Sequence, residues 1–272
     1  MRLKFFCPRW GAEQLSWPDF LRKVKEAGYD GVEYAIGANV QVAELDAVWN
    51  ACEVMGLSLI AQHYDTEDAD FNLHYDKYAE WLEKMEPYPV VKINSQTGKD
   101  YFSLTQNKLL IALAIEYTGV TGSPVVHETH RGKFSFAAHL TCQYLRELHD
   151  LRLTLDVSHW VCVSESYLEH QLRAIELAIS RTDHLHARVG YPEGPQVVDP
   201  FLPEWSAALE AHLGWWDSLV SLKKWQEAKE LTVTPEYGPY PYAIEAPLTR
   251  KVLGDQWGIN VRMMRFLRGR YE

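Results

Sequence analysis

Short β-rich runs alternate with longer helical runs along the whole chain, and this rhythm limits the possible folds more than any other feature. The predicted strands are residues 3–7, 31–36, 57–64, 89–94, 124–129, 152–159, 183–189 and 231–236. The predicted helices are residues 17–27, 42–55, 73–85, 104–117, 136–148, 164–179 and 204–229, with an eighth over 259–268. The sequence therefore contains eight β-then-α units.

Eight such units with short connections are typical of a (βα)₈ TIM barrel. No linker rich in Gly, Ser or charge divides the chain, so we expect one domain over residues 1–272. A doubly wound open sheet is the alternative α/β architecture, although it rarely needs eight units of such regularity.

Composition narrows the possible partners and the compartment. The chain has 272 residues, 47% of them hydrophobic, and a formal net charge of −10, so it can bury a large core but offers no basic stripe for nucleic acid. The four cysteines, Cys7, Cys52, Cys142 and Cys162, form no CxxC motif, which suggests reduced thiols and a cytoplasmic protein. We expect no signal peptide, no membrane span and a small-molecule substrate.

Acidic or histidine-bearing segments end four consecutive predicted strands. They are His-Glu-Thr-His at 127–130, Asp-Val-Ser-His at 156–159, His-Leu-His-Ala-Arg at 184–188 and Pro-Glu-Tyr-Gly at 235–238. The carboxyl ends of barrel strands form the active site, and strand alternation puts His184 and His186 on one face. Each segment alone could be a capped turn or a core histidine. Together they indicate a site for Mn²⁺, Mg²⁺ or Co²⁺, with Zn²⁺ possible, because carboxylates and one imidazole suit these ions.

These residues resemble the xylose isomerase-like TIM-barrel superfamily. The resemblance rests on Gly-Tyr-Asp-Gly-Val-Glu at 28–33, the Glu of strand five, the Asp-x-x-His of strand six, the His of strand seven and the Glu of strand eight. It extends over essentially the whole chain. The superfamily includes sugar isomerases, ketose 3-epimerases, inosose dehydratases and type IV abasic-site endonucleases, so the resemblance implies the fold more strongly than the reaction.

The resemblance implies that the metal ligands are Glu128, Asp156, His186 and Glu236. His186 is preferred to His184 because strand seven of the superfamily usually reads His-x-Lys-Asp from its ligand onward, and here that register gives His-Ala-Arg-Val. The final Val replaces a common carboxylate, and residues 190–200 hold no Asp-x-His pair for further metals. We therefore expect one divalent ion, with Mn²⁺ placed first.

The resemblance also implies that Glu128 and Glu236 act as acid and base as well as ligands. They would remove and return a proton next to the carbonyl of a sugar, ketose or related polyol, through a metal-stabilised enediolate. The expected protein is then an isomerase or epimerase.

Further residues are expected to contact the substrate or support the site. His159 would reach a substrate oxygen or stand behind the metal ligands, and Arg188 would bind a substrate oxygen or orient the enediolate. His63 would hydrogen-bond the sugar unless it is a buried structural histidine. Glu33 is expected to be structural or to contact the substrate. Eight aromatic residues at strand ends could stack on a sugar, and we expect about half to do so: Trp10, Tyr34, Tyr64, Trp160, Tyr191, Tyr237, Tyr240 and Tyr242. Trp10 and Tyr237 are the two assigned to substrate binding.

Three other functions stay open from the sequence. A dehydratase or lyase acting on an inosose or a 3-keto-glycoside would begin with the same proton abstraction. A metal-dependent, endonuclease-like phosphodiesterase would need extra metal ligands and a basic groove, and a non-catalytic sugar-binding barrel would not need the ligand set. The resemblance implies a dimer or tetramer, and phosphorylation of the substrate stays open.

Overall fold

Eight parallel strands close into a barrel in the computed structural model, which describes residues 1–272. The strands are β1 (Arg2–Pro8), β2 (Gly31–Ala35), β3 (Ser58–His63), β4 (Lys92–Ser95), β5 (Val125–Glu128), β6 (Leu153–Leu155), β7 (Thr182–His186) and β8 (Glu230–Thr234). Each strand pairs with the next, and β8 pairs with β1. The predicted single-domain (βα)₈ barrel is confirmed.

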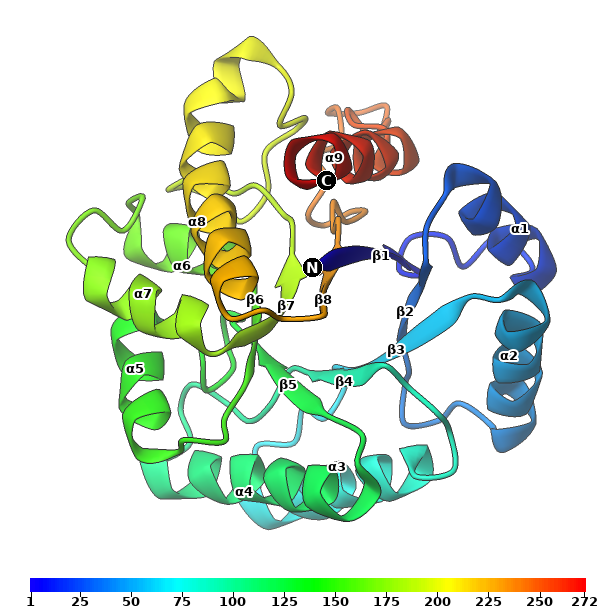
Figure 1. Ribbon diagram of the computed structural model, residues 1–272, viewed down its shortest axis with the longest axis vertical. Coiled ribbons are helices and arrows are strands. Elements are labelled where there is room, and N and C mark those ends of the chain that lie inside the picture. The colour runs from blue at the N-terminus through cyan, green and yellow to red at the C-terminus, as the bar shows by residue number, and fades with distance from the viewer.

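Helices surround the barrel (Figure 1). They are α1 (Trp17–Ala27), α2 (Val42–Met55), α3 (Phe71–Met85), α4 (Leu104–Thr121), α5 (Ala138–Glu147), α6 (Val157–Ser164), α7 (Leu172–Ser180), α8 (Ser206–Trp225) and α9 (Gln256–Tyr271), with a 3₁₀ turn at Pro203–Trp205. The side chain of Ser16 caps α1, and Gly28 ends it in the left-handed conformation with φ of 92°. None of these helices combines the length and the apolar character that crossing a bilayer requires.

The region after β6 differs from the prediction. Strand 152–159 was predicted, but β6 ends at Leu155 because the Asp156 side chain accepts the Ser158 N–H and starts α6. The predicted helix 164–179 is also wrong. Glu165 and Leu168 take left-handed φ values of 48° and 61°, so the chain breaks there and resumes helix only at Leu172.

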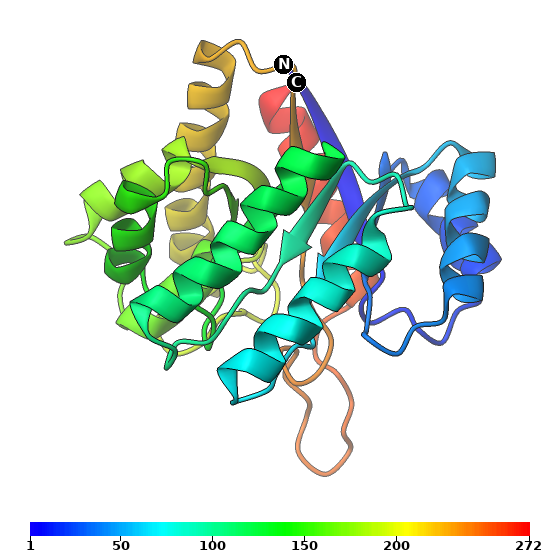
Figure 2. The same cartoon turned by 90° about the horizontal axis from the view of Figure 1, so that it is seen from below.

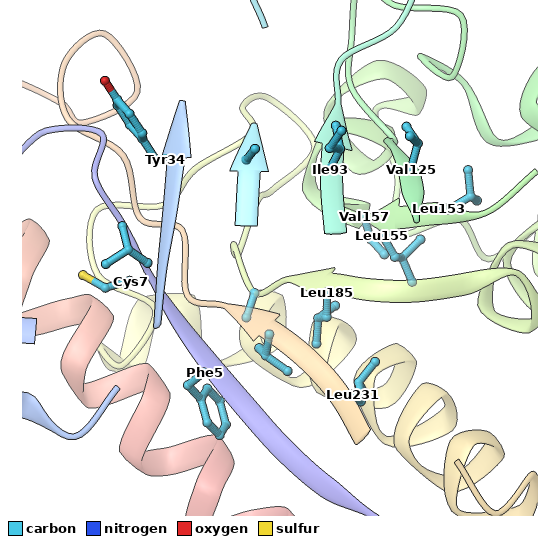
Figure 3. Packing of buried hydrophobic residues seen from close by; sticks show 14 of the residues in the cluster. Phe5, Cys7, Tyr34, Ile93, Val125, Leu153, Leu155, Val157, Leu185 and Leu231 are labelled. Atoms are coloured by element: carbon cyan, nitrogen blue, oxygen red, sulfur yellow. The ribbon is translucent and has the colours of Figure 1, made fainter. Parts of the chain in front are cut away.

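Strand alternation separates an apolar outer layer from a polar interior. The outward side chains of β1, β6 and β7, among them Phe5, Leu155 and Leu185, belong to the main hydrophobic core (Figure 3). The alternate residues point into the barrel, and most of them are buried polar groups, including His184 and Thr232, although Phe6 of β1 is apolar. The centre of this barrel is therefore a hydrogen-bonded polar column that leads up to the strand ends.

The segment between β8 and α9 projects from the barrel as a long loop (Figure 2). An isolated bridge between Glu245 and Val252 closes the outer part of this loop. At its inner part, the Tyr242 ring lies 5.3 Å from the Trp10 ring, so the loop returns one aromatic side chain to the barrel mouth.

Candidate active site

Four residues from four consecutive strand ends converge inside the barrel mouth. Glu128 ends β5, Asp156 follows β6, His186 ends β7 and Glu236 follows β8. One ligand atom from each lies within 4.8 Å of the others, and all four residues are buried. The structure thus brings together the four residues that the sequence suggested as metal ligands.

Arg188 forms ion pairs with two of these carboxylates. Its Nε lies 3.0 Å from Asp156 Oδ2, and its terminal nitrogen lies 2.5 Å from Glu236 Oε2. Burial raises the pKa of Asp156 to about 6, although Arg188 opposes that shift. The guanidinium stands two residues beyond His186 and faces the same side of the chain, as strand alternation requires.

Glu33 fixes the orientation and the tautomer of His186. The Nε2 atom of His186 lies 3.0 Å from Glu33 Oε1, and because an ionised carboxylate only accepts hydrogen bonds, Nε2 must carry the proton. Burial opposes ionisation of Glu33, but His186 and His184 outweigh it and hold its pKa well below the usual range. The Nδ1 atom of His186 is therefore left facing Glu128 and Glu236.

His184 has no nitrogen left for a metal. Its Nε2 lies 3.1 Å from Glu33 Oε2, and its Nδ1 lies 2.8 Å from Thr232 Oγ1. Both histidines of β7 face the barrel interior, as predicted, but only His186 presents an unused ring nitrogen to the carboxylates.

The cluster has the atoms and the charge that a divalent cation requires. Glu128 Oε1 is buried without a hydrogen-bond partner, and His186 Nδ1 faces two carboxylates, at 2.7 Å from Glu236 Oε2 and 3.5 Å from Glu128 Oε1. Burial lowers the pKa of His186, but Glu236 and Glu33 outweigh it and hold that pKa well above the usual range. Burial disfavours the Glu128 carboxylate, but His186 outweighs this and lowers its pKa to about 2. A metal would take the place of the proton on His186 Nδ1. With that ring neutral, three carboxylates against one guanidinium leave two negative charges, which one divalent ion neutralises. The residues present therefore fit a divalent metal.

His159 lies beside this cluster on α6. Neither of its ring nitrogens has a hydrogen-bond partner, and Nε2 lies 3.7 Å from Asp156 Oδ2. Burial, reinforced by His130 and Arg188, holds its pKa well below the usual range, so the ring is neutral. Its ring centroid is 4.0 Å from that of His130, and with Glu128 these residues form a second group of possible ligands.

A cavity of about 610 Å³ opens above the cluster. One side carries Gln96, His130, Arg188 and Glu236, and the other side is mainly aromatic. Four of the eight predicted aromatic residues line it: Trp10, Tyr34, Tyr64 and Tyr242. Trp10 lies so close to Gly238 that a Cβ there would come within 2.3 Å of its ring, which explains the glycine of the Pro-Glu-Tyr-Gly segment.

His63 does not contact the cavity, contrary to the substrate-binding prediction. Its Nδ1 lies 3.0 Å from Ser95 Oγ and its Nε2 lies 2.7 Å from Thr66 Oγ1, so both nitrogens are engaged. The preceding residue, Gln62, faces the cavity, and alternation therefore turns His63 outward against Tyr78 of α3. His63 is a structural residue.

Tyr237 also points away from the cavity. Since Glu236 faces the cluster, the next side chain turns to the other side, where it packs with Ala243 and Ile259. Its backbone N–H donates to Asn260 of α9 at 2.7 Å. The prediction of a substrate contact at Tyr237 is wrong for the same geometric reason as at His63.

Sequence reasoning missed two residues that hold the carboxylates. Gln96 donates to Glu128 Oε2 at 3.0 Å, and Ser158 Oγ donates to Asp156 Oδ1 at 2.5 Å. Gln96 directly follows β4, so its place at a strand end was an available signal. Ser158 is two residues after a helix-capping Asp, a spacing that also suggests a local hydrogen bond.

Comparison with known proteins gives structural matches only. No family model matches the sequence, and no curated protein matches it. Three solved structures are similar over most of their length. The probable 3-DHS dehydratase AsbF, involved in petrobactin synthesis, from Bacillus anthracis has 15% identity and a TM-score of 0.61, covering 98% of this chain and 99% of that one.

The other two structures have similar scores. A sugar phosphate isomerase/epimerase from Parabacteroides distasonis has 14% identity and a TM-score of 0.55, covering 88% of this chain and 92% of that one. An AP endonuclease of family 2 from Brucella melitensis has 13% identity and a TM-score of 0.54, covering 87% and 93%. This chain therefore has a (βα)₈ TIM-barrel fold like that of these three structures, with a buried Glu/His cluster that can hold a divalent metal at its strand ends.

Proposed function

We propose that this protein is a divalent-metal-dependent isomerase or epimerase acting on a sugar, a ketose or a related polyol derivative. The observation that carries the proposal is the buried cluster at the cavity floor, in which Glu128 Oε1 lacks a hydrogen-bond partner and His186 Nδ1 faces the Glu128 and Glu236 carboxylates. A buried oxygen without a partner costs free energy, and a bound cation would satisfy it and would bind the other carboxylates as well.

Glu128, Asp156, His186 and Glu236 would hold the metal. Oxygen-rich ligand sets with one imidazole favour Mn²⁺, and Mg²⁺, Co²⁺ and Zn²⁺ are the alternatives to be tested. When bound, such an ion supplies Lewis-acid polarisation of a substrate carbonyl.

The two glutamates would move the proton. Glu236 lines the cavity, so its carboxylate is the group within direct reach of a substrate. Glu128 approaches from β5, three strands away around the barrel, and Gln96 holds its Oε2. Two carboxylates that approach from different strands can remove a proton and return it at a neighbouring position.

Arg188 would bind a substrate oxygen. It lines the cavity while it bridges Asp156 and Glu236, so it can donate to a substrate oxygen beside the reacting carbon. His159 is buried and does not line the cavity, so it would stand behind the metal ligands beside Asp156 rather than contact the substrate.

The charge distribution supports a sugar rather than a nucleic acid. The cavity carries Glu13, Glu44 and Glu236 against Arg9 and Arg188, and the whole chain has a net charge of −10. Residues 190–200 contribute to none of the clusters of possible metal ligands, so the extra ligands expected of a multi-metal endonuclease are missing from that loop.

The direct test is hydrogen exchange in D₂O. Protein loaded with Mn²⁺ is incubated with a panel of ketoses, inososes and 3-keto-glycosides, and the products are followed by NMR. Deuterium at one carbon with the mass otherwise retained supports the proposal. Loss of water or of an aglycone supports the dehydratase or lyase alternative, and a panel without any exchange contradicts proton abstraction.

A separate measurement tests the ligand assignment. Mn²⁺ binding by the wild type is compared with binding by a variant carrying Asp156→Asn, His186→Gln and Glu236→Gln. The proposal requires that the variant lose metal while circular dichroism shows an intact fold. Unchanged metal binding would remove the site from consideration.

A further inference from the structure

The cavity is larger than one sugar ring requires. It encloses about 610 Å³, whereas a hexose occupies on the order of 200 Å³ at the packing density of protein interiors. The possible metal ligands lie at one end, so a sugar held there leaves most of the volume unfilled. The remainder, which we name the outer chamber, is lined by Trp10, Trp17, Tyr34, Val40, Gln62 and Tyr64.

Aromatic faces dominate the outer chamber and come from a different part of the barrel than the cluster. Trp17 begins α1, Tyr34 lies on β2, and their ring centroids are 4.8 Å apart. Tyr64 directly follows β3 and is 41% exposed, so its ring is available to a ligand. Aromatic faces of this kind stack on flat apolar surfaces, including the C–H face of a sugar and an aromatic ring.

The charged groups of the outer chamber are already engaged within the protein. Arg9 donates to the carbonyl of Leu15 at 2.8 Å and lies 4.6 Å from the Trp17 ring. Glu44 accepts the Tyr34 hydroxyl at 3.0 Å, and Glu13 accepts the Gly11 N–H at 2.9 Å. These groups are one guanidinium and two carboxylates, a balance that disfavours a phosphate or carboxylate, so the chamber suits an uncharged ligand.

Gln62 offers the chamber an unused hydrogen-bonding group. Gln62 lines the cavity and is only 7% exposed, and its side-chain amide atoms are not among the buried atoms that lack a partner, so the amide faces the cavity. Buried amides are normally paired. An amide that presents both a donor and an acceptor to a cavity matches a hydroxyl group or a bridging ether oxygen.

We infer that the substrate is a neutral keto-glycoside: the ring at the cluster carries the carbonyl group next to which the proton is removed, and a second ring, either another sugar or an aromatic group, occupies the outer chamber. This inference rests on the proposed function for the sugar at the cluster end. The second ring would stack on Trp17 and Tyr64, and Gln62 would bond the oxygen that joins the two rings or a nearby hydroxyl. The chamber would thus select a two-ring substrate over a free monosaccharide.

The test compares ligands that differ only in the second ring. Isothermal titration calorimetry measures binding to the Mn²⁺-loaded protein of methyl and phenyl β-D-glycosides of glucose, galactose, mannose and xylose, together with cellobiose and lactose. We expect at least one phenyl glycoside or disaccharide to bind about tenfold more tightly than the methyl glycoside of the same sugar. A gain for phenyl glycosides alone identifies an aromatic second ring, and a gain for disaccharides alone identifies a sugar.

Two matched variants locate the effect. Val40→Trp fills the outer chamber, while Val54→Trp adds the same side chain on an exposed position of α2, where Val54 is 87% exposed. Val40→Trp should abolish the preference for the second ring while Mn²⁺ affinity and methyl-glycoside affinity stay unchanged, and Val54→Trp should preserve it. Gln62→Leu should weaken the preference without removing it.

The outcomes separate this inference from the proposed function. Equal binding of the methyl, phenyl and disaccharide ligands, no binding by any of them, or a preference that survives Val40→Trp overturns the inference. The protein could show a second-ring preference that depends on Val40 but exchange no deuterium with any substrate. That result would support the outer chamber as a binding site and refute the proposed reaction. Deuterium exchange without a second-ring preference would support the reaction and refute the inference about the outer chamber.

Discussion

The two sides of the cavity differ in how their polar groups are satisfied. On the β5–β8 side, three buried carboxylates face one guanidinium, and two ligand atoms have no partner. On the β1–β3 side, Arg9, Glu13 and Glu44 are each paired within the protein, and aromatic faces fill the wall. The first side has more buried carboxylates than cations and is suited to a metal and proton transfer, while the second has its charged groups bonded within the protein and is suited to selecting the substrate.

Removing a reactive carboxylate should have the largest effect of these changes. It should reduce the reaction at the β5–β8 side and leave ligand binding at the β1–β3 side nearly unchanged. We expect Glu236→Gln to reduce deuterium exchange by about 10²–10⁴-fold because it removes an acid/base group that lines the cavity. Glycoside affinity should change far less. Glu53→Gln, an exposed substitution on α2, serves as the control, and a Glu236 variant with wild-type exchange would refute the assigned role.

Removing the guanidinium of the cluster should expose the charge of its carboxylates. Arg188→Met leaves Asp156 and Glu236 buried without their partner, and we expect a loss of about 3–5 kcal/mol in the free energy of unfolding. Mn²⁺ should restore part of this stability, so thermal unfolding is measured with Mn²⁺ and with a chelator. The exposed substitution Arg22→Met is the control, and an Arg188 variant with wild-type stability in chelator would contradict the charge argument.

Changing the residue behind His186 should affect the metal without touching the substrate. Glu33→Gln removes the carboxylate that requires a proton on His186 Nε2, so Nδ1 is no longer held free. Loss of such a partner typically lowers metal affinity by about 10–100-fold. Competition titration with Mn²⁺ measures the change. An unchanged affinity would show that the Glu33 carboxylate is not needed to set the tautomer.

The smallest effect is expected on the neutral side. Tyr34→Phe removes the hydrogen bond to Glu44 and should cost about 1 kcal/mol of stability. Mn²⁺ affinity should stay at the wild-type value, because Tyr34 contacts no member of the cluster. If metal affinity falls with this variant, the two sides are coupled and the comparison must be revised.

Local sequence signals were sufficient for most of the architecture. The bounds of α1 and α2 were predicted correctly, because Ser16 caps α1, Gly28 and Gly56 end the two helices, and the apolar residues recur with helical spacing. The same signals were misread after β6. The Asp-x-Ser cap there starts a helix directly at the strand end. The three Val residues of that helix favour a strand, so the sequence predicted a longer β6.

The sequence predicted the residues of the metal-binding cluster better than it predicted which neighbouring side chains face the cavity. Position at a strand end was enough to suggest Glu128, Asp156 and Glu236, since parallel strands in a barrel bring such residues to one edge. The same criterion failed for His63 and Tyr237. Both stand next to a residue that faces the cavity, and a shift of one position reverses the direction of a side chain.

The sequence by itself determined the barrel, the edge at which chemistry can occur and the types of ligand gathered there, because periodicity and capping act over a few residues. Only the tertiary structure decided that His186 rather than His184 has a free nitrogen, since Glu33 makes that choice from β2, 153 residues away from His186. The outer chamber likewise exists only where side chains from three strand ends meet. Hydrogen-bond partners and cavity walls join distant parts of the chain, and local patterns do not encode those contacts.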